Sequence, residues 1–380
     1  MGPISVVLEE VLSLLALDGD HAAAARGRQA GVWRVEEPDY LPLLFAGPPP
    51  ARRDAHPRFD LRACYFDPEK MLIEQAWGMA AVAASGSDAL PSMRPNLGCG
   101  VLATTLGARQ EVFPDRMPWV VERAGKAHLS RLEPGPHLLN RGEFPRVLDY
   151  ARYFVERLAG RAPVYCFDTQ GPFDTAHLAY GDAIFTDLYD DPPFVRHLME
   201  LCTSVFIEGL KALKAVTGEP LDAAYHYNEM YMERGGARSS EDTTTLIRPA
   251  DIETFILPYL ARCFQPFGGG YVHFCGHHAE ILRMLCGMPE VRGVNFGNPE
   301  AYDPAEVLPM MLERGIVYYG QWPARDGETL ESYFRRILEP LDGRRAGLIL
   351  QLPGGLEPWR VSGQDAMRLW HTVQNALAVN

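Results

Sequence analysis

The chain has 380 residues, which is long enough to bury a large hydrophobic core as one large domain or two. Its hydrophobic content of 47% and charged content of 22% are ordinary for a soluble globular protein, and a net charge of −13 argues against a nucleic-acid-binding surface. No stretch of about 18 residues is both apolar and free of charged residues, so no membrane span is expected. The seven scattered cysteines, odd in number, favour reduced thiols and a cytoplasmic location.

Residues 1–60 show no clean strand pattern and are rich in Pro, Ala and Arg. The apolar run 4–17 contains Glu9 and Glu10 and has no basic start, so it predicts an amphipathic helix rather than a signal peptide. We therefore expect an N-terminal helical extension over 1–60, packed against a main domain over 61–380.

The main domain alternates short apolar runs with helical stretches, which is typical of βα units around a parallel sheet. Helix starts are marked by Asp191-Pro192, by Asp303-Pro304 and by Pro249. Seven such units without a G-x-G-x-x-G motif predict an α/β fold of the closed (β/α)8 TIM-barrel type rather than a doubly wound sheet. The predicted strands are 90–93, 163–167, 223–227, 271–275, 291–296, 316–319 and 347–352.

Polar residues follow nearly every predicted strand. Because barrel enzymes carry their chemistry at the C-terminal strand ends, we expect one polar pocket there that takes a small-molecule substrate. Glu229 and Asp168 are candidate general acids or bases, unless they are a solvated loop carboxylate and a helix cap. The candidate substrate-binding residues are Arg94, which could instead pair with a loop acid, Gln170, Gln321 and Trp322, the last by stacking.

The segment 271–278 reads Tyr-Val-His-Phe-Cys-Gly-His-His and ends a predicted strand. Positions i and i+2 of a strand point to the same face, so His273 and Cys275 project together. Imidazole and thiolate are ligand types that Zn²⁺ prefers, and Gly276 permits a turn that brings His277 back toward them. Glu229 and His278 are alternative third ligands. The alternative to a metal site is a hydrogen-bonded pair within the pocket.

Five segments, in this order and spacing, resemble the uroporphyrinogen decarboxylase superfamily, which also contains zinc methyltransferases that move methyl groups from corrinoid proteins. The resemblance extends over roughly residues 65–378 and implies a TIM barrel. The segments are Thr-Gln-Gly-Pro-Phe-Asp at 169–174, Leu-Tyr-Asp-Asp-Pro-Pro at 188–193, the helix 249–259, His-Phe-Cys-Gly at 273–276 and Gly-Gln at 320–321.

The chain departs from both branches of that family. The decarboxylases carry an Arg-Gln-Ala-Gly-Arg motif that grips substrate carboxylates, whereas the motif here ends in Val32 after Arg28. They also use an Asp at a strand end, whereas residues 90–94 contain no acid and Asp88 lies earlier. The methyltransferases bind zinc through His-x-Cys and a distant Cys, but residues 352–356 read Leu-Pro-Gly-Gly-Leu.

The resemblance therefore implies a zinc-dependent methyltransferase that moves a methyl group between a corrinoid or small methyl donor and a thiol or similar acceptor. Its metal ligands would be His273 and Cys275 with His277 or Glu229, and methylcobalamin or a corrinoid protein would be the donor and partner. A homodimer is left open. The alternatives are a cofactor-free decarboxylase or lyase and a non-catalytic barrel that binds a small molecule.

Overall fold

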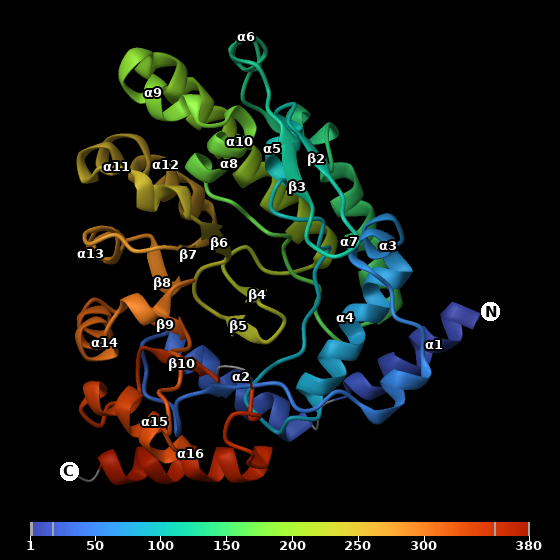
Figure 1. Ribbon diagram of the computed structural model, residues 1–380, viewed down its shortest axis with the longest axis vertical. Coiled ribbons are helices and arrows are strands. Elements are labelled where there is room, and N and C mark those ends of the chain that lie inside the picture. Colours follow the sequence, from blue (N-terminus) through green and yellow to red (C-terminus); the bar gives the residue numbers. More distant parts are fainter. Residues whose placement is uncertain (1–2, 17–18, 353–354, 379–380) are drawn as a thin grey trace.

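The computed structural model describes residues 3–16, 19–352 and 355–378. Six parallel strands form one sheet in the order β1-β10-β9-β8-β7-β6 (Figure 1). The predicted strands 271–275 and 347–352 thus lie in the same sheet, as a barrel requires. The strands are β1 (Leu43–Leu44), β6 (Ala237–Ser240), β7 (Gly270–Phe274), β8 (Val291–Phe296), β9 (Val317–Gly320) and β10 (Leu348–Gln351).

Two extended segments close this sheet into a ring with eight positions. Parallel bridges join residues 88–93 to residues 163–170, and join the latter to β6. On the other side, the Asp88 N–H donates to the Leu43 carbonyl at 3.0 Å, which connects residues 88–93 to β1. The predicted (β/α)8 TIM barrel is confirmed.

Helices cover the outside of the ring, and α11 to α15 line the outer side of β6 to β10 (Figure 1). The predicted capping residues are confirmed, since Asp191 and Asp303 accept backbone N–H groups at the starts of α10 and α14. No helix among the described residues is long and apolar enough to cross a membrane. The helices are α1 (Pro3–Leu12), α2 (Gly19–Trp33), α3 (Leu61–Phe66), α4 (Pro68–Ala83), α5 (Val101–Thr105), α6 (Lys126–Leu129), α7 (Phe144–Leu158), α8 (Pro172–Tyr180), α9 (Ala183–Asp190), α10 (Pro192–Thr217), α11 (Pro249–Phe255), α12 (Leu257–Phe264), α13 (Ile281–Cys286), α14 (Pro304–Glu313), α15 (Leu330–Leu338) and α16 (Gly363–Ala378).

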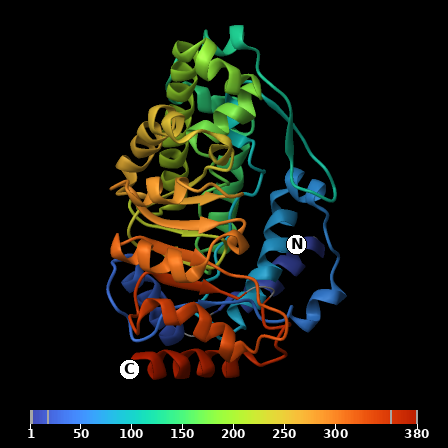
Figure 2. The same cartoon turned by 60° about the vertical axis from the view of Figure 1, so that its left-hand side comes forward.

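The N-terminal segment contributes a strand to the ring as well as helices. Strand β1, which was not predicted, pairs in parallel with β10. Helix α1 packs against α4, on the side of the molecule away from β6 to β10 (Figure 2). Helix α2 contacts β10, and its Arg28 guanidinium bonds to Asp39 and to the fully buried carboxylate of Asp88. Residues 19–44 are therefore built into the barrel.

The predicted strand 223–227 is not a member of the parallel barrel sheet. Residues 224–226 do form a strand, β4 (Ala224–His226), but it pairs antiparallel with β5 (Met230–Met232). This hairpin lies within the ring (Figure 1), and its tip carbonyls accept the N–H groups of Leu90 and Ser92. The fourth position of the ring belongs to β6, whose sequence Ala-Arg-Ser-Ser lacks the apolar residues of a typical buried strand.

An exposed antiparallel pair, β2 (Arg109–Glu111) and β3 (Trp119–Glu122), lies between α5 and α6 along the chain.

Candidate metal centre

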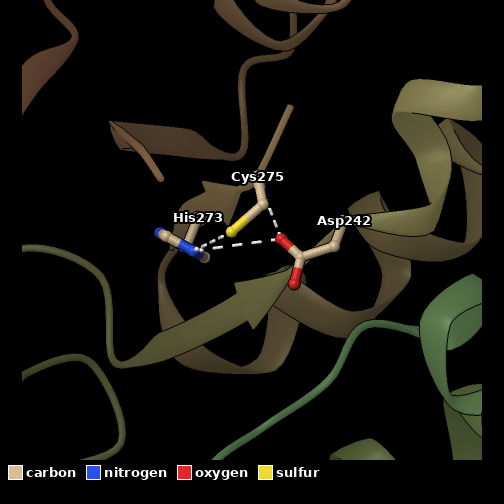
Figure 3. Close-up of side chains that lie close together, drawn as sticks. All are labelled: Asp242, His273 and Cys275. Atoms are coloured by element: carbon tan, nitrogen blue, oxygen red, sulfur yellow. Dashed lines mark hydrogen bonds and ion pairs between the residues drawn. The ribbon is translucent and has the colours of Figure 1, made fainter. Parts of the chain in front are cut away.

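Three side chains meet at the C-terminal ends of β6 and β7 (Figure 3). They are Asp242, His273 and Cys275, whose ligand atoms all lie within 4.8 Å of one another. The Cys275 Sγ is 3.4 Å from His273 Nε2, and Asp242 Oδ1 is 3.9 Å from the same nitrogen. Imidazole, thiol and carboxylate together form a set that Zn²⁺ accepts, so this cluster is a candidate metal centre.

The hydrogen bonds around His273 leave its Nε2 available to the cluster. Asn295 on β8 donates its Nδ2–H to the Tyr319 carbonyl at 2.7 Å, which turns its Oδ1 toward His273 Nδ1. Nδ1 therefore carries the proton, and the lone pair of Nε2 faces Cys275 and Asp242. Burial and the nearby charge of Arg238 lower the pKa of His273, which keeps the imidazole neutral as a metal ligand must be.

Asp242 is held by backbone hydrogen bonds on two sides. Its Oδ1 accepts the Cys275 N–H at 2.6 Å. The carboxylate of Asp174, on α8, accepts the N–H groups of Asp242 and Thr243 at 2.7 and 2.8 Å. Burial, together with the charge of Asp242, raises the pKa of Asp174 to about 7. The position of Asp242 is thus set by the fold itself.

Cys275 lies in a tight turn between β7 and α13. Gly276 has a φ of 91°, which favours glycine, and its N–H donates to Asn298 Oδ1 at 2.7 Å. A Cβ atom on Gly297 would lie 2.3 Å from the Cys275 Sγ, so the close approach of the two segments depends on that glycine. Burial and the carboxylate of Asp242 raise the pKa of the Cys275 thiol to about 11.

Asp168 lies at the same end of the ring, in an ionic group with two arginines. Arg238 Nη1 is 2.5 Å from its Oδ1, and Arg94 Nη2 is 3.8 Å from its Oδ2. Burial opposes ionisation, but the charges of Arg238 and Arg94 outweigh it and lower the pKa of Asp168. Gln170 Nε2 donates to Asp168 Oδ1 at 3.3 Å. Asp168 is therefore an ionised partner of both arginines. Arg94, a candidate substrate-binding residue, pairs with this carboxylate.

Glu229 and Gln321 line another part of the barrel mouth. A cavity of about 990 Å³ lies over the ends of β1, β9 and β10 and is lined by both residues and by Gln351. The Tyr319 hydroxyl and Gln351 Nε2 each donate to Glu229 Oε1 at 2.5 Å. Burial raises the pKa of Glu229 to about 7, although both hydrogen bonds act in the opposite direction.

Three further predicted residues, His277, His278 and Trp322, lie apart from these groups. The His277 ring packs on Tyr302 at a centroid distance of 5.3 Å and lines a separate small cavity with His278. Trp322 is 2% exposed, and its indole N–H donates to the Tyr302 carbonyl at 2.8 Å, so it packs in the core rather than facing a ligand. Among the described residues, the metal-type cluster contains neither His277 nor Glu229.

Asp242 and Arg238 are site residues that the local sequence pattern does not predict. The sequence does contain a signal for Asp242, because two acids, Glu241 and Asp242, directly follow the segment 237–240. This segment precedes the strand with the His-x-Cys motif by about one βα unit. The local sequence of β6 does not predict a strand, so the pattern places the strand end at Asn228 and Glu229 instead.

The sequence matches the profile of the family described as uroporphyrinogen decarboxylase (URO-D) over residues 30–308. The chain belongs to the uroporphyrinogen decarboxylase family. The structure is similar to that of a methyltransferase from Methanosarcina mazei, with a TM-score of 0.64 and 14% sequence identity over 93% of this chain and 98% of the other. At this identity the likeness shows a shared fold. A comparison with curated proteins gives no match.

Proposed function

We propose that this member of the uroporphyrinogen decarboxylase family is a zinc-dependent methyltransferase whose metal is held by Asp242, His273 and Cys275. It would move a methyl group between a corrinoid or small methyl donor and a thiol or similar acceptor. The observation that carries the proposal is the convergence of three ligand atoms within 4.8 Å at the strand ends where barrel enzymes place their chemistry. The methyltransferase activity in the name of the Methanosarcina protein supports the reaction class.

The donor set fits zinc in its chemistry and in its orientation. Three protein ligands are the number found in catalytic zinc sites, and a bound Zn²⁺ lowers the pKa of a coordinated thiol so that a nucleophilic thiolate exists at neutral pH. Residues beside the three ligands hold them in place. Asn295 directs Nε2 of His273 into the site, and Asp174 fixes the backbone of Asp242. We propose Asp242 as the third ligand in place of His277.

The contacts of Arg28 favour this proposal over tetrapyrrole decarboxylation. In the decarboxylases the corresponding motif grips substrate carboxylates. Here the guanidinium of Arg28 bonds to Asp39 at 2.9 and 3.0 Å and to Asp88 at 2.7 Å. Because Asp88 is fully buried, that pairing serves the fold, and Arg28 is occupied by protein carboxylates.

Metal analysis of untagged protein, purified without chelators and supplemented with zinc, tests the site. We expect about one zinc per chain. Asp242→Asn, His273→Ala and Cys275→Ser should each lose the metal, while the matched control His277→Ala should keep it. Metal-free wild-type protein would overturn the metal site. Loss of zinc in His277→Ala, with retention in Asp242→Asn, would assign the third ligand to His277.

A methyl-transfer assay tests the reaction itself. Methylcobalamin and a simple thiol are incubated with the zinc-loaded protein, and demethylation is followed by the change in the cobalamin absorption spectrum. We expect turnover in the wild type and none in Cys275→Ser. A zinc-loaded wild type that leaves methylcobalamin unchanged, and also fails with small methyl donors, would contradict the proposed reaction while leaving the metal site intact.

A further inference from the structure

Glu229 presents one carboxylate oxygen to the cavity over β1, β9 and β10. Both of its side-chain donors, the Tyr319 hydroxyl and Gln351 Nε2, reach Oε1. Among the described residues, no group donates a hydrogen bond to Oε2. The residue is only 6% exposed and lines the cavity, so this oxygen is an acceptor at the cavity wall that a ligand could satisfy.

The hairpin tip holds this carboxylate in a fixed place. The His226 carbonyl accepts the Glu229 N–H at 3.2 Å, and the two residues between them, Tyr227 and Asn228, have φ values of 55° and 66°, as in a type I′ turn. The Tyr165 hydroxyl donates to Asn228 Oδ1 at 2.6 Å. A non-glycine backbone in this conformation persists only where the surroundings enforce it, so the position of Glu229 is preorganised.

The other walls of the cavity are mainly apolar. Phe45 and Leu352 are buried side chains of the lining, and the charged side chains of the lining other than Glu229 are Glu357 and Arg360, both exposed at the rim. The volume of about 990 Å³ admits a small organic molecule. An unpartnered carboxylate oxygen surrounded by apolar surface is complementary to a positively charged hydrogen-bond donor carried on an apolar body.

We propose that this cavity binds a small organic ammonium ion, a primary or secondary amine on an apolar body, whose N–H donates to Oε2 of Glu229. A neutral hydroxyl would leave the buried charge of the carboxylate unbalanced, and an anionic ligand would be repelled by it. The site goes beyond the proposed methyl transfer and does not depend on it. None of the residues that line the cavity is a proposed metal ligand.

Three probes with one carbon skeleton test the charge preference: benzylamine, benzyl alcohol and benzoate. Binding to the full-length protein at pH 8 is measured by ligand-observed NMR titration. We expect benzylamine to bind at least about tenfold more tightly than benzyl alcohol, since it forms a charge-assisted hydrogen bond, and benzoate not to bind. Equal binding of the amine and the alcohol, or tighter binding of benzoate, would overturn the proposal without any variant being needed.

The protonation of Glu229 provides a second readout. Because its pKa is raised to about 7, the ionised fraction, and with it the affinity for benzylamine, should rise about tenfold from pH 6 to pH 8. The groups that face the carboxylate are the Tyr319 hydroxyl and the Gln351 amide, with Glu357 and Arg360 at the rim, and none of the described residues that line the cavity is a histidine.

Glu229→Gln assigns the effect to this side chain, because it keeps the shape and removes the charge. The variant should lose both the preference for the amine and the pH dependence, whereas Glu313→Gln, at the exposed end of α14, should behave as the wild type. Retention of the preference in Glu229→Gln would overturn the proposal. Zinc-free protein should give the same ranking of probes, so failure here and failure of the metal site are separate results.

Discussion

Asn295 determines which nitrogen of His273 faces the candidate metal centre. Its amide donates to the Tyr319 carbonyl and its oxygen meets His273 Nδ1, so replacement by an apolar residue frees the ring to turn and to change tautomer. We expect Asn295→Leu to weaken zinc affinity by about 10- to 100-fold, the usual effect of losing a partner of a ligating histidine. Competition with a chromophoric chelator measures this. Asn295→Asp, which keeps the acceptor, should retain most of the affinity, and an unchanged affinity in Asn295→Leu would exclude the role.

Strand geometry alone predicts that the side chains of His273 and Cys275 point to the same face, and the structure places His273 Nε2 3.4 Å from Cys275 Sγ. The third member of the cluster could not be found in this way. Asp242 comes from the end of the neighbouring strand, and neighbours in a barrel are set by tertiary pairing rather than by local spacing. His277 is close in sequence, yet the turn at Gly276 directs it toward Tyr302.

The tip of the hairpin β4–β5 places two non-glycine residues, Tyr227 and Asn228, in the left-handed backbone region. Asn228→Ala removes the acceptor of the Tyr165 hydroxyl and places an alanine at a φ of 66°, so we expect a loss of about 2 kcal/mol in the free energy of unfolding. Asn228→Gly loses the same hydrogen bond but accepts the left-handed conformation, so it should lose about 1 kcal/mol less than the alanine variant. Denaturant unfolding measures both. Equal losses would mean that the turn is not strained.

The strand elements show where local pattern suffices and where it fails. Strands β7 to β10 are rich in Val, Ile, Leu, Tyr and Phe and were predicted nearly to their ends. Residues 223–227 have the same character and do form a strand, but nothing local distinguishes a hairpin within the ring from a member of the ring. Conversely, β6 contains Arg238, whose buried charge is balanced by Asp168, which lies 70 positions earlier in the sequence. Strand propensities depend on neighbouring residues in the sequence, so they cannot predict a charge that is balanced by a residue far away in the chain.

On the scale of the whole molecule, buried carboxyl groups couple folding to pH. The pKa of Glu229 is raised from an ordinary 4.5 to about 7, so between these values the native state binds more protons than the unfolded chain. The free energy of unfolding therefore falls as the pH rises through this window, by about 2–3 kcal/mol from Glu229. Asp174 and Glu241 contribute with the same sign, because burial raises the pKa of each.

The contribution of Glu229 can be isolated with Glu229→Gln. Relative to the wild type, this variant should gain about 2–3 kcal/mol in the free energy of unfolding between pH 4.5 and pH 7.5, because it has no proton to lose. Urea unfolding at several pH values measures the difference, with Glu313→Gln as a control that stays parallel to the wild type. A difference that does not change with pH would show that Glu229 titrates normally in the folded protein.

The N-terminal segment and the barrel should fold as one cooperative unit. A chain that begins at residue 61 lacks β1, which leaves one edge of β10 unpaired, and lacks Arg28, which leaves the fully buried Asp88 without its cation. The second loss alone costs roughly 3–5 kcal/mol, a large part of the stability of a typical domain.

We therefore expect the chain from residue 61 to show no cooperative thermal transition by circular dichroism. A chain that begins at residue 19 loses the packing of residues 3–15 on α4 and the ion pairs of Glu9 and Glu10, but it keeps the ring of eight positions closed, so it should unfold cooperatively at a lower temperature than the full chain. If the chain from residue 61 unfolded like the full protein, residues 1–60 would be an extension that only packs against the barrel, as predicted from the sequence, and would not be needed for the barrel to fold. The contacts of β1 and Arg28 argue that they are not, because the sheet cannot close without them.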